Sequence, residues 1–125
     1  MTRALSFIVA TACLAPWLEV RADNWPAWRG PTGQGICEET ELPLEWGASK
    51  NIRWKLPLPA PGNSTPIAWG KRIFLTQATN SGAERWTWCV NRDDGKVAWK
   101  KKVAYAGSEP THATNPYCSA SPVTA

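Results

Sequence analysis

Four short apolar runs, each ended by residues that favour a tight turn, constrain the fold of this chain more than any other feature. The runs cover residues 65–69, 72–77, 86–91 and 96–103. Gly70-Lys71 is a two-residue link of the kind that joins antiparallel strands. Arg92-Asp93-Asp94-Gly95 is a second turn sequence. We therefore predict an all-β chain with a four-stranded antiparallel meander over residues 65–103.

The side-chain pattern predicts which residues share a face of this sheet. Trp86, Trp88 and Val90 alternate along one strand, and we expect Val97 and Trp99 to continue the same face on the next. The strands are apolar on both faces, so both faces need covering. A single meander leaves large apolar surfaces exposed, and the sheet is therefore expected to require neighbours on each side.

The segments around the meander are rich in Trp and Pro, of which the chain has 9 and 11. Frequent Pro and Gly make residues 23–50 irregular, and we expect Trp25, Trp28 and Trp46 to attach this segment to a larger body. Two further strands are expected, one over residues 51–58 and the start of another over residues 119–125.

Residues 1–22 resemble a secretory signal peptide. A basic residue at Arg3 precedes an apolar stretch, and Val20-Arg21-Ala22 supplies small residues for cleavage after Ala22. The alternatives are a buried N-terminal helix, which Pro16 disfavours, and a lipoprotein acylated at Cys13, whose preceding residues match poorly. We expect an exported chain, periplasmic or secreted, without a lipid anchor. No apolar run reaches the roughly 18 residues of a membrane-spanning helix.

Charge and cysteine content exclude several kinds of site. The net charge is +4, and the basic residues are scattered apart from Lys100-Lys101-Lys102. These lysines suit a solvated strand that resists edge pairing, so no nucleic-acid binding is expected. Outside the predicted signal peptide, Cys37, Cys89 and Cys118 cannot all pair within one chain, and their pairing stays open. With no Cys-x-x-Cys spacing and His112 as the only histidine, no metal site is predicted.

A repeat-like motif surrounds the second turn of the meander. Gly95 supplies the positive φ that the turn requires, and Asn91 has a side chain able to bond turn amides. Lys96 follows the glycine, and Trp99 is large enough to fill a gap between two sheets. The spacing of Asn91, Gly95, Lys96 and Trp99 resembles the repeat of quinoprotein-type (PQQ-repeat) β-propellers. Asn91 stands where that repeat usually has Asp, and Asp94 where it usually has Thr.

Other segments extend the resemblance over nearly all of residues 23–125. They are Asn24 to Pro31, Leu42 to Trp46, Arg53 to Lys55, Ser64 to Ile67, Trp69 to Thr76 and Thr111 to Ser119. Their order is similar to that in exported bacterial propellers of planctomycete type, which include relatives of the outer-membrane assembly lipoprotein B and polyvinyl alcohol dehydrogenase-like proteins. The resemblance implies one propeller blade and the start of a second. Because a propeller has roughly four to eight blades, we expect the chain to be the N-terminal piece of an incomplete propeller.

The resemblance implies two functions. The favoured one is a binding or scaffold module in the cell envelope, whose partners are the remaining blades or envelope proteins. The alternative is part of an alcohol dehydrogenase that uses pyrroloquinoline quinone (PQQ) and Ca²⁺. The chain lacks the adjacent cysteines of such enzymes and a calcium-ligand spacing. Trp86, Trp88 and Trp99 lie at strand positions where a tryptophan is expected to pack in the sheet and not to stack on a quinone. His112 is expected in a solvated loop, and Arg29 is expected to stack on a neighbouring tryptophan. We therefore predict no catalytic residue and no cofactor in this chain.

Overall fold

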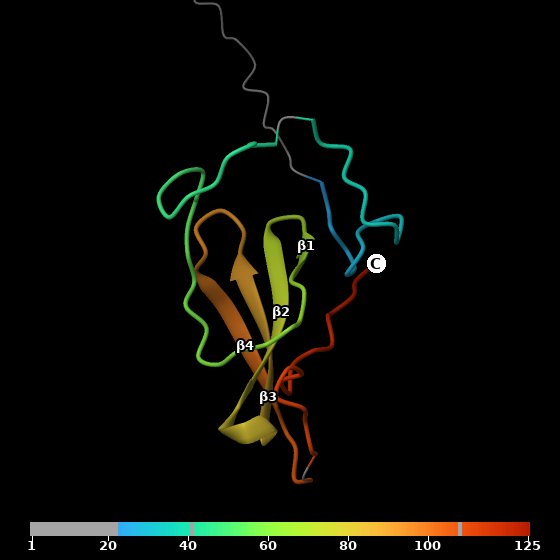
Figure 1. The fold of residues 1–125 in the computed structure, drawn as a ribbon, viewed down its shortest axis with the longest axis vertical. Coiled ribbons are helices and arrows are strands. Elements are labelled where there is room, and N and C mark those ends of the chain that lie inside the picture. The colour runs from blue at the N-terminus through green and yellow to red at the C-terminus, as the bar shows by residue number, and fades with distance from the viewer. Residues whose placement is uncertain (1–22, 41, 108) are drawn as a thin grey trace, which may run out of the picture.

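The computed structural model describes residues 23–40, 42–107 and 109–125, and the predicted signal peptide and Cys13 lie outside these residues. Within them, four strands form one antiparallel sheet in the order β1-β2-β3-β4 (Figure 1). The elements are β1 (Ile67–Trp69), β2 (Arg72–Thr79), the short 3-10 turn η1 (Asn80–Gly82), β3 (Glu84–Asn91) and β4 (Val97–Ala104). The prediction of an all-β chain with a four-stranded meander is confirmed.

The strand register assigns the side chains to two faces. We call one the covered face; it carries Ile73, Leu75, Trp86, Trp88, Val90, Val97, Lys100 and Lys102. We call the other the open face; it carries Phe74, Thr76, Thr87, Cys89, Trp99, Lys101 and Val103. The expected shared face of Trp86, Trp88 and Val90 is confirmed, because these side chains line the covered face together.

The hydrophobic core lies on the covered face. Leu75, Trp88 and Val90 form its buried centre, and Trp54 and Leu56 pack against them. The two packing residues come from the segment that was expected to be a strand, but residues 51–58 form no strand. Pro57 and Pro59 lack the N–H groups that a ladder needs. The segment therefore contributes side chains to the core without joining the sheet.

A β-bulge changes the predicted face of Trp99. The register pairs Val90 with Val97 but Cys89 with Trp99, which leaves Ala98 as an extra residue on β4. The expectation that Val97 and Trp99 share a face is therefore wrong. Val97 joins the core, whereas Trp99 lies on the open face and is 40% exposed.

The two ends of the described chain lie beside β1 (Figure 1). Trp25 forms an isolated antiparallel bridge with Ala68, with backbone hydrogen bonds of 2.8 and 2.9 Å. The backbone N–H of Thr65 donates to the Ser121 hydroxyl at 2.8 Å, and the N–H of Thr124 donates to the Pro26 carbonyl at 3.0 Å. The strand expected over residues 119–125 is wrong, because this segment forms no ladder and meets Thr65, Thr76 and Pro26 through single hydrogen bonds.

Residues 23–50 form no strand or helix in their described part, which agrees with the irregular segment expected there. Only one of its three tryptophans attaches it to the sheet as expected. Trp25 is half-buried beside β1, whereas Trp28 and Trp46 are 64% and 67% exposed. Among the described residues, no helix has the length and apolar content needed to cross a membrane.

Candidate functional site

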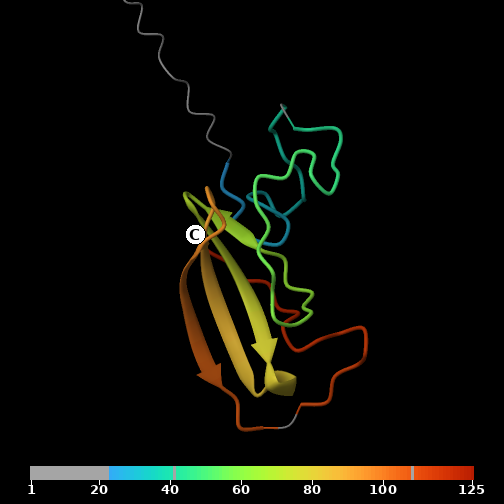
Figure 2. The ribbon, with the colours of Figure 1, turned by 90° about the vertical axis from the view of Figure 1, so that its left-hand side faces the viewer.

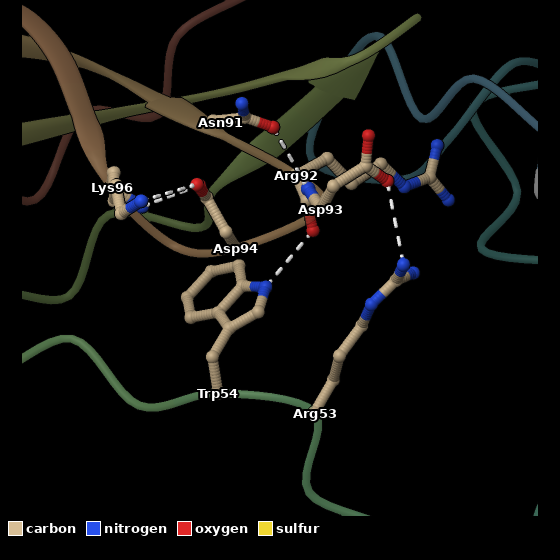
Figure 3. A network of polar contacts seen from close by, with 7 residues as sticks. All are labelled: Arg53, Trp54, Asn91, Arg92, Asp93, Asp94 and Lys96. Atoms are coloured by element: carbon tan, nitrogen blue, oxygen red, sulfur yellow. Dashed lines mark hydrogen bonds and ion pairs between the residues drawn. The ribbon is translucent and has the colours of Figure 1, made fainter.

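Three of the four motif residues lie at the turn between β3 and β4: Asn91 ends β3, and Gly95 and Lys96 precede β4. Figure 3 shows Asn91 and Lys96 with the other polar residues of this turn. Gly95 has a φ of +71°, as predicted for this turn, and its N–H donates to the Asn91 carbonyl at 2.9 Å. The Asn91 side-chain oxygen accepts a 3.0 Å hydrogen bond from the backbone N–H of Asp93. The sequence prediction that Asn91 bonds a turn amide is confirmed. The side chain of Lys96 is exposed and lies 3.3 Å from the carboxylate of Asp94.

Asp94 closes the other side of the same turn. Its side-chain oxygen accepts a 3.0 Å hydrogen bond from the backbone N–H of Lys96. This hydrogen bond, together with the nearby Lys96 ammonium group, lowers the pKa of the Asp94 carboxyl below its usual value. The turn is therefore held from both sides by short polar side chains, and the carboxylate form of Asp94 stabilises it.

A tryptophan from outside the sheet supports the turn from below (Figure 3). The indole N–H of Trp54 donates to the Arg92 carbonyl at 2.9 Å. Beside it, the guanidinium group of Arg53 lies 3.5 Å from the Asp93 carboxylate. Residues 53 and 54 thus fix the turn through one hydrogen bond and one ion pair.

The fourth motif residue, Trp99, lies on the open face with Phe74. The two rings are 6.0 Å apart at an interplanar angle of 51°, a tilted aromatic pair. Val103, farther along β4 on the same face, is 69% exposed, and Trp69 at the end of β1 is 40% exposed. Along β4 the open face therefore presents apolar side chains to solvent, as an interaction surface does, whereas on β2 the Thr76 hydroxyl donates to the Ala120 carbonyl of the C-terminal segment at 2.9 Å.

The thiol of Cys89, on the middle strand β3, lies between Phe74 on β2 and Trp99 on β4. Cys89 pairs with Phe74 on one side and Trp99 on the other, and is 1% exposed. Burial raises the pKa of the Cys89 thiol, and the positive charge of Arg72 offsets part of this effect. A neutral, buried thiol is inert as a nucleophile. Cys89 therefore acts as a packing residue, and like Cys37 and Cys118 it is not in a disulfide.

The covered face carries lysines stacked on tryptophans. The Lys100 ammonium lies 3.5 Å from the ring centroid of Trp88, and that of Lys102 lies 5.6 Å from the ring centroid of Trp86. Lys102 also donates to the Glu84 carboxylate at 2.8 Å. Such contacts combine cation–π attraction with packing of the lysine stem on the ring.

These contacts bear on whether the described residues suit a quinone and Ca²⁺. The rings of Trp86 and Trp88 are occupied by lysines and by the core, so neither offers a free face to a quinone. The described part of the chain holds no cluster of three or more His, Cys, Asp or Glu side chains arranged for a metal ion. Of the three tryptophans weighed for quinone stacking, Trp86 and Trp88 are therefore used in other contacts, whereas Trp99 is 40% exposed on the open face.

The remaining candidate residues lie apart from the open face. The guanidinium group of Arg29 lies 5.1 Å from the ring centroid of Trp28, so the predicted stacking is confirmed. His112 lies in an exposed loop, where its Nδ1 is 2.9 Å from the Thr114 hydroxyl. A pocket of about 470 Å³ lies between residues 23–25 and 31–39. These features share no contact that would assemble a catalytic site.

Sequence reasoning missed two parts of this arrangement. The support of the turn by Trp54 depends on a contact 38 residues away along the chain, which no local pattern reports. The exposure of Trp99 depends on the bulge at Ala98. An indication was present only in the first case, since the prolines after Trp54 disfavour a central strand.

Comparison with known proteins identifies no relative: no family model, no curated protein and no solved structure matches the chain. The relationship to the PQQ-repeat propellers therefore stays a prediction from the sequence motifs.

Proposed function

We propose that this chain is part of an exported propeller of the PQQ-repeat type and serves as a binding or scaffold module in the cell envelope. The observation that carries the proposal is the open face, where Phe74 and Trp99 form an aromatic pair and Val103, farther along β4, is exposed on the same face. The occupant of this face is a second β-sheet, either a further blade or a domain of an envelope protein.

The shape of the open face supports a sheet as its occupant. Two sheets that pack face to face interdigitate side chains from alternate positions of their strands. Phe74, Trp99 and Val103 project from such positions on β2 and β4. A partly exposed tryptophan among smaller side chains is also the residue type that contributes most at protein interfaces. Burial of this face on association is thus its main contribution to function.

The alternative is that the chain contributes to a PQQ-dependent alcohol dehydrogenase. In that case the quinone and Ca²⁺ would be held by residues outside those described here, and the open face would still serve as the contact to them. The chain by itself is proposed to have no enzymatic activity.

Photo-crosslinking in cells tests the proposal. The full chain is expressed with a benzophenone amino acid at position 99 and, as the control, at position 46, which is more accessible (67% against 40% exposed) but lies outside the sheet. We expect position 99 to form crosslinks to β-rich polypeptide that position 46 does not form. Equal crosslinking from both positions would contradict the proposal. Oxidation of alcohols by the purified chain with PQQ and Ca²⁺ would instead support the dehydrogenase.

A further inference from the structure

Strand β4 forms an edge of the sheet. It spans Val97–Ala104, pairs with β3 on one side, and pairs with no strand of the described chain on its other side (Figure 2). Seven of its eight residues are exposed. An unpaired edge presents a row of backbone N–H and C=O groups that an additional strand can use.

The central residues of this edge are three consecutive lysines. Lys100 and Lys102 lie on the covered face, and Lys101 lies on the open face. Positive charge therefore lies on both sides of the strand within its central three residues. Lys100 and Lys102 are held above Trp88 and Trp86 at 3.5 and 5.6 Å from the ring centroids. These contacts restrict the two side chains, which lowers the entropy lost when they pair with a ligand.

This arrangement selects against a second copy of the chain at the same edge. When two antiparallel copies of β4 pair about their centres, lysines of one strand lie opposite lysines of the other. Like charges at directly opposed positions destabilise a sheet. An extended segment with carboxylates at its centre reverses this effect, because Lys100 and Lys101 then meet opposite charges, while Lys102 keeps its ion pair with Glu84.

We propose that the free edge of β4 binds an acidic polypeptide segment of a partner protein in extended conformation, which adds to the sheet as a fifth strand. Backbone hydrogen bonds supply affinity in this type of recognition, and side chains at alternate positions supply specificity. The segment needs carboxylates at consecutive central positions, since the lysines point to both faces. A flanking apolar residue meets Trp99 or Val103 on the open face. This site is an edge and does not depend on the sheet contact proposed above.

The probe for this proposal is a synthetic peptide, Val-Thr-Val-Glu-Glu-Glu-Val-Thr, labelled with a fluorophore and titrated with the purified chain while anisotropy is recorded. Lys101→Glu is the test variant, with Lys101→Gln as the milder change. Lys71→Glu, at an exposed position in the β1–β2 turn, is the matched charge control. We expect Lys101→Glu to weaken binding at least tenfold, Lys101→Gln to weaken it less, and Lys71→Glu to change it less than twofold.

Backbone pairing is tested with two N-methylated peptides. Methyl groups at alternate amide nitrogens block one hydrogen-bonding edge of the peptide, and methyl groups at the other set block the opposite edge. Binding through a ladder requires that one of these peptides loses affinity and the other keeps it. Equal binding of both peptides would overturn the proposal, as would equal weakening by Lys101→Glu and Lys71→Glu. Self-association of the unmodified chain through β4, detected by sedimentation without peptide, would also overturn it.

The edge experiment is distinguishable from the test of the open face. Phe74→Ser, on β2, removes one ring of the aromatic pair on the open face but leaves the backbone edge and the lysines of β4 in place. With the benzophenone amino acid at position 99, we expect this variant to lose the crosslinks to a second sheet. With tryptophan at position 99, we expect it to retain most of its affinity for the acidic peptide.

Discussion

The indole ring of Trp54 lies directly against Gly95: a Cβ atom added to Gly95 would come within 2.5 Å of the ring atom Cδ2. Gly95 also has a φ of +71°, which L side chains rarely adopt. Two independent requirements, one conformational and one steric, therefore select glycine at this position.

Gly95→Ala is expected to destabilise the chain by at least about 2 kcal/mol, because backbone strain and overpacking each contribute roughly 1–3 kcal/mol. Gly33→Ala is the matched control: Gly33 has a φ of +73° but no atom within 4 Å of an added Cβ. Denaturant unfolding of both variants separates the two effects. Equal losses in the two variants would show that the contact with Trp54 contributes nothing.

Trp88 and Trp99 are expected to differ in their contribution to stability, although both lie in the sheet. Trp88 is 5% exposed in the core, and its replacement by Ala should cost about 3–5 kcal/mol in the free energy of unfolding. Trp99 is 40% exposed, so Trp99→Ala should cost clearly less. Thermal unfolding of the two variants side by side provides the measurement. A larger loss for Trp99→Ala would mean that its ring is buried in solution.

The ion pair between Lys102 and Glu84 predicts a pH dependence. The hydrogen bond from Lys102, with a second from Thr79, lowers the pKa of Glu84 below its usual value. A carboxyl group with a lowered folded-state pKa stabilises the fold above its unfolded-state pKa, and this contribution disappears as the pH falls through the folded-state value. Lys102→Met should therefore raise the pKa of Glu84. NMR titration of the carboxyl carbon measures this shift, with Lys71→Met as a control that should leave it unchanged.

Export predicts a charged contact at the mature N-terminus. The backbone nitrogen of Asp23 lies 2.8 Å from the Glu39 carboxylate. Cleavage after Ala22 would convert this nitrogen into an ammonium group and the contact into a charge-assisted hydrogen bond. We expect the N-terminal sequence of the periplasmic protein to begin at Asp23. We also expect Glu39→Gln to lower the pKa of the α-amino group of Asp23, because the substitution removes the negative charge beside it. Uncleaved protein in the cytoplasm would contradict the export prediction.

The sheet could be predicted from the sequence because its information is local. Gly70-Lys71 and Arg92 to Gly95 define two tight turns, and a tight turn places the apolar runs on its two sides next to each other as antiparallel strands. Residues 51–58 show the limit of this reasoning. Their alternation of apolar and polar residues is typical of a strand. A strand joins a sheet only if it reaches an unpaired edge, however, and this segment packs Trp54 and Leu56 against the covered face instead.

The candidate site was predicted only in part, for a similar reason. The roles of Asn91 and Gly95 follow from turn chemistry within a few residues. The position of Trp99 depends on which residue of β4 stays unpaired, and this is decided by packing across the whole sheet. The face that a strand residue occupies changes with a shift of one residue, so a small error in register reverses the prediction.

The bulge at Ala98 implies that the rings of Trp54 and Trp99 cannot both pack on the covered face of the sheet. In a continuous register, Trp99 would lie opposite Trp88 on the side of the sheet that Trp54 and Leu56 already fill. Protein interiors are close-packed, so that side has no volume for another large ring. We infer that the occupancy of one side by Trp54 is what displaces Trp99 to the other. A change in the length of the segment that carries Trp54 would then change the position of Trp99 on the open face, and with it the apolar surface available to a partner.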